Sequence, residues 1–124
     1  MPQGKFDGYS LAFGSQLAQS RLGDTTAAAI YTAPRNAELT KIFVCNTTGS
    51  AATFRLFHDN DGTTYDQTTA LYYDYSVAAN TTLIVSSDMM GGGISIFAGG
   101  KIAFREGTAD ALTITLYGVL EQAR

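Results

Sequence analysis

An acidic loop is the stretch of this sequence whose residue types most clearly suggest chemistry. Residues 59–66 read DNDGTTYD and contain Asp59, Asp61 and Asp66. Carboxylate oxygens suit Ca²⁺, and the D-x-D-G spacing imitates the start of an EF-hand loop. The closing glutamate and the flanking helices of that motif are missing, and Asp and Gly are also the residues of tight turns. The three aspartates are therefore calcium candidates, and a plain polar loop is the simpler interpretation.

The sequence has no further set of residues with the spacing of a catalytic centre. His58 is its single histidine and Cys45 its single cysteine, so a zinc-ligand pattern is lacking. No G-x-S-x-G elbow is present to carry a nucleophilic serine. The glycines at residues 91–93 and 99–100 lack the lysine of a phosphate-binding loop. We predict that the protein is not an enzyme and uses no cofactor.

Tyrosines between residues 65 and 75 suggest a binding surface instead. Tyr72, Tyr73 and Tyr75 fall in a strand-like stretch, residues 69–75. Because neighbours on a strand point to opposite faces, strict alternation separates Tyr72 from the other two tyrosines. An outward Tyr72 could stack on a sugar or anchor a protein contact. The chain has no tryptophan, so we favour contact with another protein subunit.

The first 28 residues form a Gly-, Ser- and Gln-rich segment that resembles neither a regular strand nor an amphipathic helix. We predict an extended N-terminal arm, or a short edge strand, preceding a domain of residues 29–124. The partner-binding candidates in this arm are Phe6, Tyr9, Leu11 and Phe13. Two interpretations stay open: the arm packs on a neighbouring subunit, or it lies over its own domain.

From residue 29 onward, apolar and polar residues alternate in short runs separated by turn signals, which predicts β-strands. About eight strands are expected, at residues 29–32, 38–46, 52–58, 69–75, 82–86, 94–97, 101–106 and 111–118. Short strands at this spacing are typical of an antiparallel sandwich or barrel. The expected fold is all-β: a single antiparallel β-sandwich, Ig-like or jelly-roll.

Three finer expectations follow from the same pattern. The turn at residues 47–50 predicts a hairpin between the strands on either side of it. Residues 99–100, both glycine, carry a second hairpin signal. Residues 38–46 are partly apolar on both faces, so this strand is expected to be central and covered on each side.

Composition excludes several classes of protein. The chain has 124 residues, enough for one domain with a core of its own. Charged residues make up 15%, against about 25% in an average protein, and the net charge is −3. Disorder and basic nucleic-acid binding are therefore not expected. No apolar run approaches the ~18 residues of a membrane helix, and no apolar h-region follows Lys5, so we predict neither membrane insertion nor a signal peptide.

Several strand motifs resemble those of small virion proteins of tailed bacteriophages. The motifs are AIYTAP at 29–34, AELTKIFVCNTT at 37–48, ATFRL at 52–56, GGKI at 99–102 and TITLYG at 113–118. The resemblance spans about residues 25–120. It implies an Ig-like or jelly-roll sandwich, a place on the virion and no catalytic residues. Such domains occur as capsid decoration (cement) proteins and as tail, neck or fibre components.

These observations lead to one functional hypothesis and two alternatives. The chain is expected to be a capsid decoration protein, made in the host cytoplasm, which binds the major capsid protein as a homo-oligomer, a trimer or dimer. The first alternative is a tail, neck or receptor-binding component that contacts tail proteins. The second is a calcium-dependent or carbohydrate-binding adhesion domain that uses the acidic loop.

Overall fold

Every regular element of the described chain is a β-strand. The computed structural model describes residues 14–86 and 92–122. Its strands are β1 (Gly14–Ser20), β2 (Ala28–Thr32), β3 (Ala37–Asn46), β4 (Ala52–Asp59), β5 (Ala70–Val77), β6 (Thr82–Ser86), β7 (Ile94–Ile96), β8 (Lys101–Glu106) and β9 (Leu112–Leu120). The eight predicted strands correspond to β2–β9, because their period-two alternation buries one face. In β9, for example, Leu112, Ile114 and Leu116 are buried.

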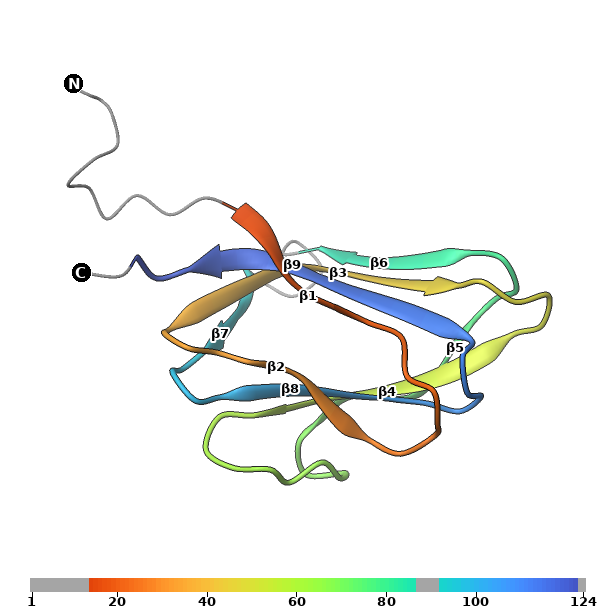
Figure 1. Cartoon of the computed structure of the whole chain (residues 1–124), viewed down its shortest axis with the longest axis horizontal. Coiled ribbons are helices and arrows are strands. Elements are labelled where there is room, and N and C mark those ends of the chain that lie inside the picture. Colours follow the sequence, from red (N-terminus) through yellow and green to blue (C-terminus); the bar gives the residue numbers. More distant parts are fainter. Residues whose placement is uncertain (1–13, 87–91, 123–124) are drawn as a thin grey trace, which may run out of the picture.

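The strands form two antiparallel sheets that face each other (Figure 1). The large sheet has the order β1-β9-β3-β6, with β7 pairing separately with β3, and the small sheet has the order β2-β8-β4-β5. The pairs β4–β5, β3–β6, β2–β8 and β1–β9 are nested, as in one long hairpin rolled into a sandwich. This is a jelly-roll topology, so the predicted all-β sandwich is confirmed and its Ig-like form is not observed.

Both expected hairpins are wrong, because turn chemistry marks a reversal of the chain but does not decide where the next strand pairs. Strands β3 and β4 belong to different sheets, and so do β7 and β8. The Asn46 side chain holds the β3–β4 connection as an arch between the sheets. Its amide donates to the carbonyls of Ser50 at 2.8 Å and Val77 at 3.0 Å, and its oxygen accepts from the Thr48 backbone N–H.

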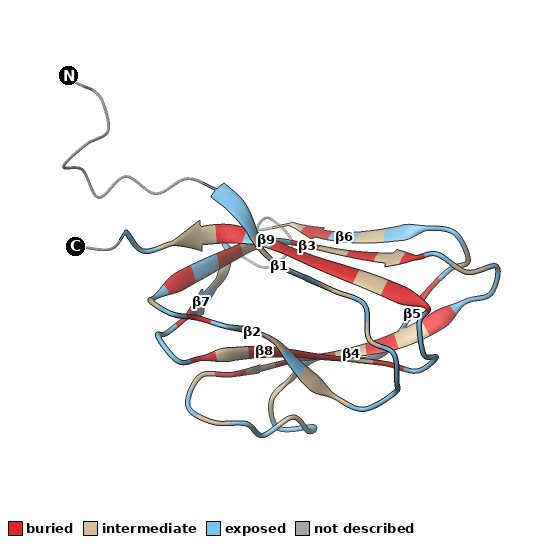
Figure 2. Cartoon of the chain, in the orientation of Figure 1, coloured by how far each residue is buried: buried red, intermediate tan, exposed pale blue. Residues whose placement is uncertain are grey.

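The core lies between the two sheets (Figure 2). Its largest fully buried side chains include Phe54 and Phe104 of the small sheet and Leu39 and Ile42 of the large sheet. The rings of Phe54 and Phe104 lie 5.7 Å apart. Burying such side chains contributes about 1.5–3 kcal/mol each to the stability of the fold.

The large sheet includes part of the segment that was expected to be an arm or a short edge strand. Residues 14–20 form β1, which pairs with β9 at the edge of this sheet. Leu17, Ala18 and Leu22 pack against the core from this side. The partner candidates Phe6, Tyr9, Leu11 and Phe13 lie outside the described residues, so the role predicted for them stays a prediction.

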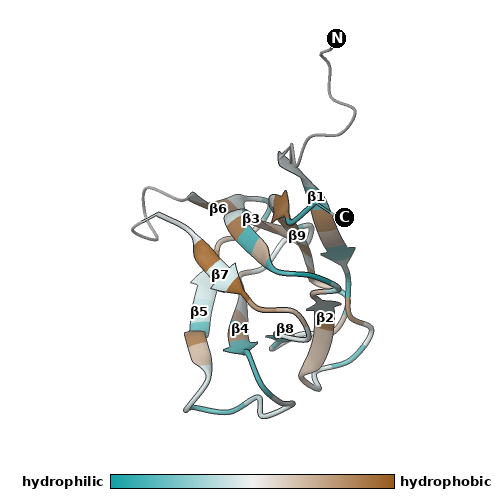
Figure 3. Ribbon diagram, turned by 90° about the vertical axis from the view of Figure 1, so that its left-hand side faces the viewer, coloured by the Kyte–Doolittle hydropathy of each residue, from teal (hydrophilic) through white to brown (hydrophobic). Residues whose placement is uncertain are grey.

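Strand β3 occupies the centre of the large sheet, as expected, but one of its faces differs from the expectation. The inner face is buried at Leu39, Ile42 and Val44. The outer face carries Phe43, which is half-buried, beside Ile84 of β6 and Tyr117 of β9. No described strand lies over this outer face (Figure 3).

Candidate protein-interaction surface

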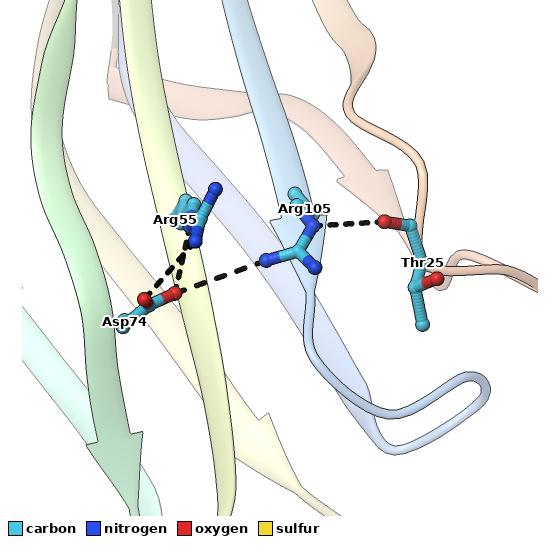
Figure 4. Close-up of polar contacts among 4 residues, drawn as sticks. All are labelled: Thr25, Arg55, Asp74 and Arg105. Atoms are coloured by element: carbon cyan, nitrogen blue, oxygen red, sulfur yellow. Dashed lines mark hydrogen bonds and ion pairs between the residues drawn. The ribbon is translucent and has the colours of Figure 1, made fainter. Parts of the chain in front are cut away.

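Two arginines face each other on the outside of the small sheet. Arg55 of β4 is the direct cross-strand partner of Arg105 of β8. Like charges directly opposite each other destabilise a sheet. The carboxylate of Asp74 lies between them: it accepts from Arg55 Nε at 2.7 Å and from Arg55 Nη2 at 3.0 Å, and it is 3.8 Å from Arg105 Nη1 (Figure 4). The carboxylate thereby offsets the repulsion between the two cations.

A β-bulge in the edge strand β5 brings Asp74 to this position. Phe54 pairs with Tyr75 and Leu56 pairs with Tyr72, so β5 has an extra residue opposite β4. Asp74 lies at φ 53°, a left-handed conformation that aspartate tolerates better than most residues. The bulge also interrupts the exposed edge of the sheet, which protects it from pairing with other strands.

Tyr73 completes this group beside the arginines. The Arg55 guanidinium lies over the Tyr73 ring, 3.9 Å from its centroid, which is a cation–π arrangement. The Tyr73 side chain is 42% exposed. Arg105 is held from the other side, since its Nε donates to the Thr25 carbonyl at 2.9 Å. We call Arg55, Tyr73, Asp74 and Arg105 the Arg–Tyr cluster.

Electrostatics fixes the charge state of the cluster. The hydrogen bonds from Arg55 and the positive charges of Arg55 and Arg105 lower the pKa of Asp74, so its carboxylate is ionised at neutral pH. Exposed ion pairs add little stability, typically 0–1 kcal/mol. The cluster therefore contributes mainly by holding side chains in place. Tyrosine and arginine, ordered before contact, are the residue types that most often dominate protein–protein binding.

Tyr72 is not the outward anchor that strict alternation predicts. Its ring lies 5.4 Å from the Phe54 ring and 5.2 Å from the Tyr75 ring, and it packs against the core. The bulge at Asp74 restarts the alternation, so Tyr72 and Tyr75 fall on the same side and Tyr73 lies on the other. The prediction that Tyr72 and Tyr75 lie on opposite faces is wrong, and the exposed neighbour of the arginines is Tyr73.

The acidic loop organises itself through its own carboxylates. Asp59 accepts from the backbone N–H groups of Asp61 at 3.1 Å and Thr64 at 2.8 Å. Asp66 accepts from the backbone N–H and the hydroxyl of Thr68. Across residues 14–86 and 92–122, no three His, Cys, Asp or Glu side chains gather in a way that could hold a metal ion. The calcium candidates thus act in this structure as acceptors within a loop.

The same hydrogen bonds make the loop sensitive to pH. The N–H groups of Thr64 and Asp61 lower the pKa of Asp59. The stabilisation of the fold by the Asp59 carboxylate is therefore present at neutral pH. It is lost as the pH falls through the pKa that Asp59 has in the folded state.

Asp59→Asn is expected to lower the midpoint of thermal unfolding at pH 7, because an amide presents one acceptor oxygen to two backbone donors. The difference from the wild type should shrink at acidic pH, where Asp59 is protonated. Millimolar calcium or EDTA should leave the wild-type midpoint unchanged in the same calorimetric scans. A calcium-dependent rise that Asp59→Asn removes would reinstate a calcium site.

Comparison with known proteins yields a weak structural likeness to a viral protein. No protein-family model matches the sequence, and no curated protein matches it. A chain in the structure of infectious bursal disease virus, Gx strain, is similar to this one with a TM-score of 0.45 and 12% identity. The match covers 90% of this chain and 33% of the viral chain, so this chain spans about a third of its length.

The Arg–Tyr cluster could not be assembled from the sequence. Alternation places Arg55 and Arg105 on outward positions of their strands, which is the available signal. Their pairing depends on the register between β4 and β8, and the position of Asp74 depends on the bulge. The described part of the chain contains no helix that could cross a membrane.

Proposed function

We propose that this protein is a non-enzymatic structural component of a tailed-bacteriophage virion, most specifically a capsid decoration protein. The Arg–Tyr cluster is the observation that carries the proposal. It is an exposed group of side chains, ordered by hydrogen bonds, and its residue types are those that anchor protein contacts. The motifs that resemble small phage virion proteins support the virion assignment, and the jelly roll, which occurs in viral capsid and lectin domains, is compatible with it.

The proposed contact uses the outer face of the small sheet. Leu71, 43% exposed, precedes the cluster on β5 and would extend the contact with apolar area. A capsid surface that offers a carboxylate to the arginines and an apolar pocket to Tyr73 would be complementary. Binding to many equivalent lattice positions would then stabilise the shell by linking neighbouring capsid subunits. The homo-oligomer predicted from the sequence is part of this proposal.

Tyr73→Ala is expected to weaken binding to capsids by about 2 kcal/mol, or roughly 30-fold in Kd, as for the loss of an interface anchor. The measurement uses virions of the phage that encodes this chain, prepared without the protein and titrated with purified variants. Phe97→Ala is the matched control, because Phe97 is a 59% exposed aromatic residue that lies outside the small sheet. Equal binding by both variants would remove the small-sheet face from the proposal.

The copy number per virion separates decoration of the capsid from the alternative of a tail or neck component. Quantitative mass spectrometry of purified virions should find this chain at a fixed ratio to the major capsid protein. A few copies per particle would favour the tail alternative. Absence of the chain from purified virions would overturn the virion assignment itself.

A further inference from the structure

The large sheet has an uncovered apolar surface on its outer side. Phe43 of β3 and Tyr117 of β9 pack edge to face with their ring centroids 5.6 Å apart. Ile84 of β6 pairs with Phe43 and is 48% exposed. Lys41 Nζ lies 6.0 Å from the Phe43 ring. We call Lys41, Phe43, Ile84 and Tyr117 the aromatic face.

This face has a shape that can receive a chain segment. A shallow groove of about 280 Å³ runs between Thr40, Lys41, Phe43 and Tyr117. An apolar outer face at the centre of a sheet is usually covered by a further layer of the protein. The apolar residues on both faces of residues 38–46 predict such a layer. The described residues do not supply that layer, so the question is which segment does.

The chain enters the sandwich beside this face. Gly14 starts β1 and pairs with Val119 of β9, which in turn pairs with Glu38 of β3. Figures 1 and 3 show the first residues of β1 on the side of the large sheet that faces away from the small sheet. The described chain therefore begins, at Gly14, on the side of the aromatic face.

The length and composition of this segment suit the face. Strands lie ~4.8 Å apart and rise ~3.3 Å per residue. From Gly14, Tyr117 is then roughly 8 Å away, Phe43 roughly 18 Å and Ile84 roughly 21 Å by the strand register. A chain extended at ~3.3 Å per residue covers these distances in about three, six and seven residues. In the sequence, Leu11, Tyr9 and Phe6 precede Gly14 by three, five and eight residues.

We propose that residues 1–13 fold back from Gly14 and cover the aromatic face of their own chain. The reversal would begin at Gly14, a residue type that allows a wide range of backbone angles, at a position where an added Cβ would meet no atom within 4 Å. Attachment to β1 also gives the segment an effective concentration near its own face that a second copy reaches only at high protein concentration. The proposal is independent of the virion role, because it leaves the small-sheet face free.

Cys45 is a built-in probe for this arrangement. It follows the buried Val44 on β3, so its side chain belongs to the outer side of the sheet with Phe43. It is the single cysteine and is half-buried. By the same register arithmetic it lies roughly 25 Å from Gly14, a distance that about eight or nine extended residues span. Residue 5 is therefore positioned to reach it.

The test is disulfide trapping in the full chain carrying Lys5→Cys, under mild oxidation. We expect a 5–45 disulfide within one chain, seen as a covalent monomer and identified by peptide mapping. Phe43→Ser with Tyr117→Ser should slow its formation at least tenfold, whereas the small-sheet control Tyr73→Ser should leave the rate unchanged. Ile84→Ser serves as a second face variant should the double substitution compromise folding, and circular dichroism decides that point.

The other outcomes overturn the proposal. A 5–45 disulfide between two chains would make a second copy the occupant. An intrachain disulfide whose rate is the same in the face variants would mean that the segment meets Cys45 by diffusion on its tether. Failure to form the disulfide would place residues 1–13 elsewhere.

Discussion

Gly118→Ala is expected to lower the free energy of unfolding by roughly 3 kcal/mol, the upper range for forcing extra atoms into a packed site. A Cβ at this position would clash with the Glu38 carbonyl oxygen and would lie 2.9 Å from Leu17 Cδ1. The oxygen belongs to the backbone of β3 and cannot rotate away. Relief of the clash would require the central pair of the large sheet to separate.

The close approach at Gly118 follows from a bulge in the sheet. Leu39 pairs with Gly118 and Lys41 pairs with Tyr117, so Thr40 is the extra residue of β3. The Glu38 carbonyl lies beside this bulge and close to Gly118, where a glycine leaves room for it. Gly49→Ala is the matched control, because its Cβ would meet no atom within 4 Å. Chemical denaturation should separate the two variants; equal stability would mean that the β3–β9 pair shifts at little cost.

The positions of the strands could be predicted because burial imposes a local period. Residues 111–118 alternate Leu112, Ile114 and Leu116 with threonines and a tyrosine, and the apolar set is buried in β9. The assignment of strands to sheets could not be predicted, because it depends on partners distant in the sequence. The Asn46 side chain illustrates the limit: its bonds to Ser50 and Val77 define the arch, but an asparagine before two threonines and a glycine also suits a tight hairpin.

The candidate surface was missed for a related reason. Alternation is a rule for regular strands, and β5 is irregular at two places opposite β4. Each irregularity shifts the following side chains to the other face, so Tyr72 turns toward Phe54 and Tyr73 turns toward Arg55. The aspartate between the tyrosines is a local signal for a bulge, since aspartate tolerates positive φ. A carboxylate at this position can be explained only when Arg55 and Arg105 are known to be neighbours, because it offsets the repulsion between them.

The two exposed surfaces differ in a way that suits different occupants. The Arg–Tyr cluster is polar, charged and held by hydrogen bonds on the small sheet, which favours a partner that arrives from solution. The aromatic face lies on the large sheet and is largely apolar. The described chain begins beside it, at Gly14, which favours an occupant from the same chain. Covering the aromatic face desolvates few charges, because Lys41 is the one charged residue of that group, whereas a partner of the Arg–Tyr cluster must satisfy its charged groups.

Glu106→Leu is expected to lower the free energy of unfolding by about 2–6 kcal/mol, because it leaves two buried donors without an acceptor at about 1–3 kcal/mol each. The Glu106 side chain is fully buried at the end of β8. Its Oε1 accepts from the backbone N–H groups of Ala111 at 2.8 Å and Leu112 at 3.0 Å, where β9 begins. The added apolar area of leucine does not replace these bonds.

Glu106→Gln separates the hydrogen bonds from the shape of the side chain. Its amide oxygen can occupy the position of Oε1 and keep both acceptor contacts. Its amino group then replaces Oε2, which is buried without a hydrogen-bond partner, so no existing bond is lost. We expect the glutamine variant to stay within about 1 kcal/mol of the wild type in urea denaturation. Equal stability of the leucine and glutamine variants would show that the start of β9 is held by packing rather than by the Glu106 oxygen.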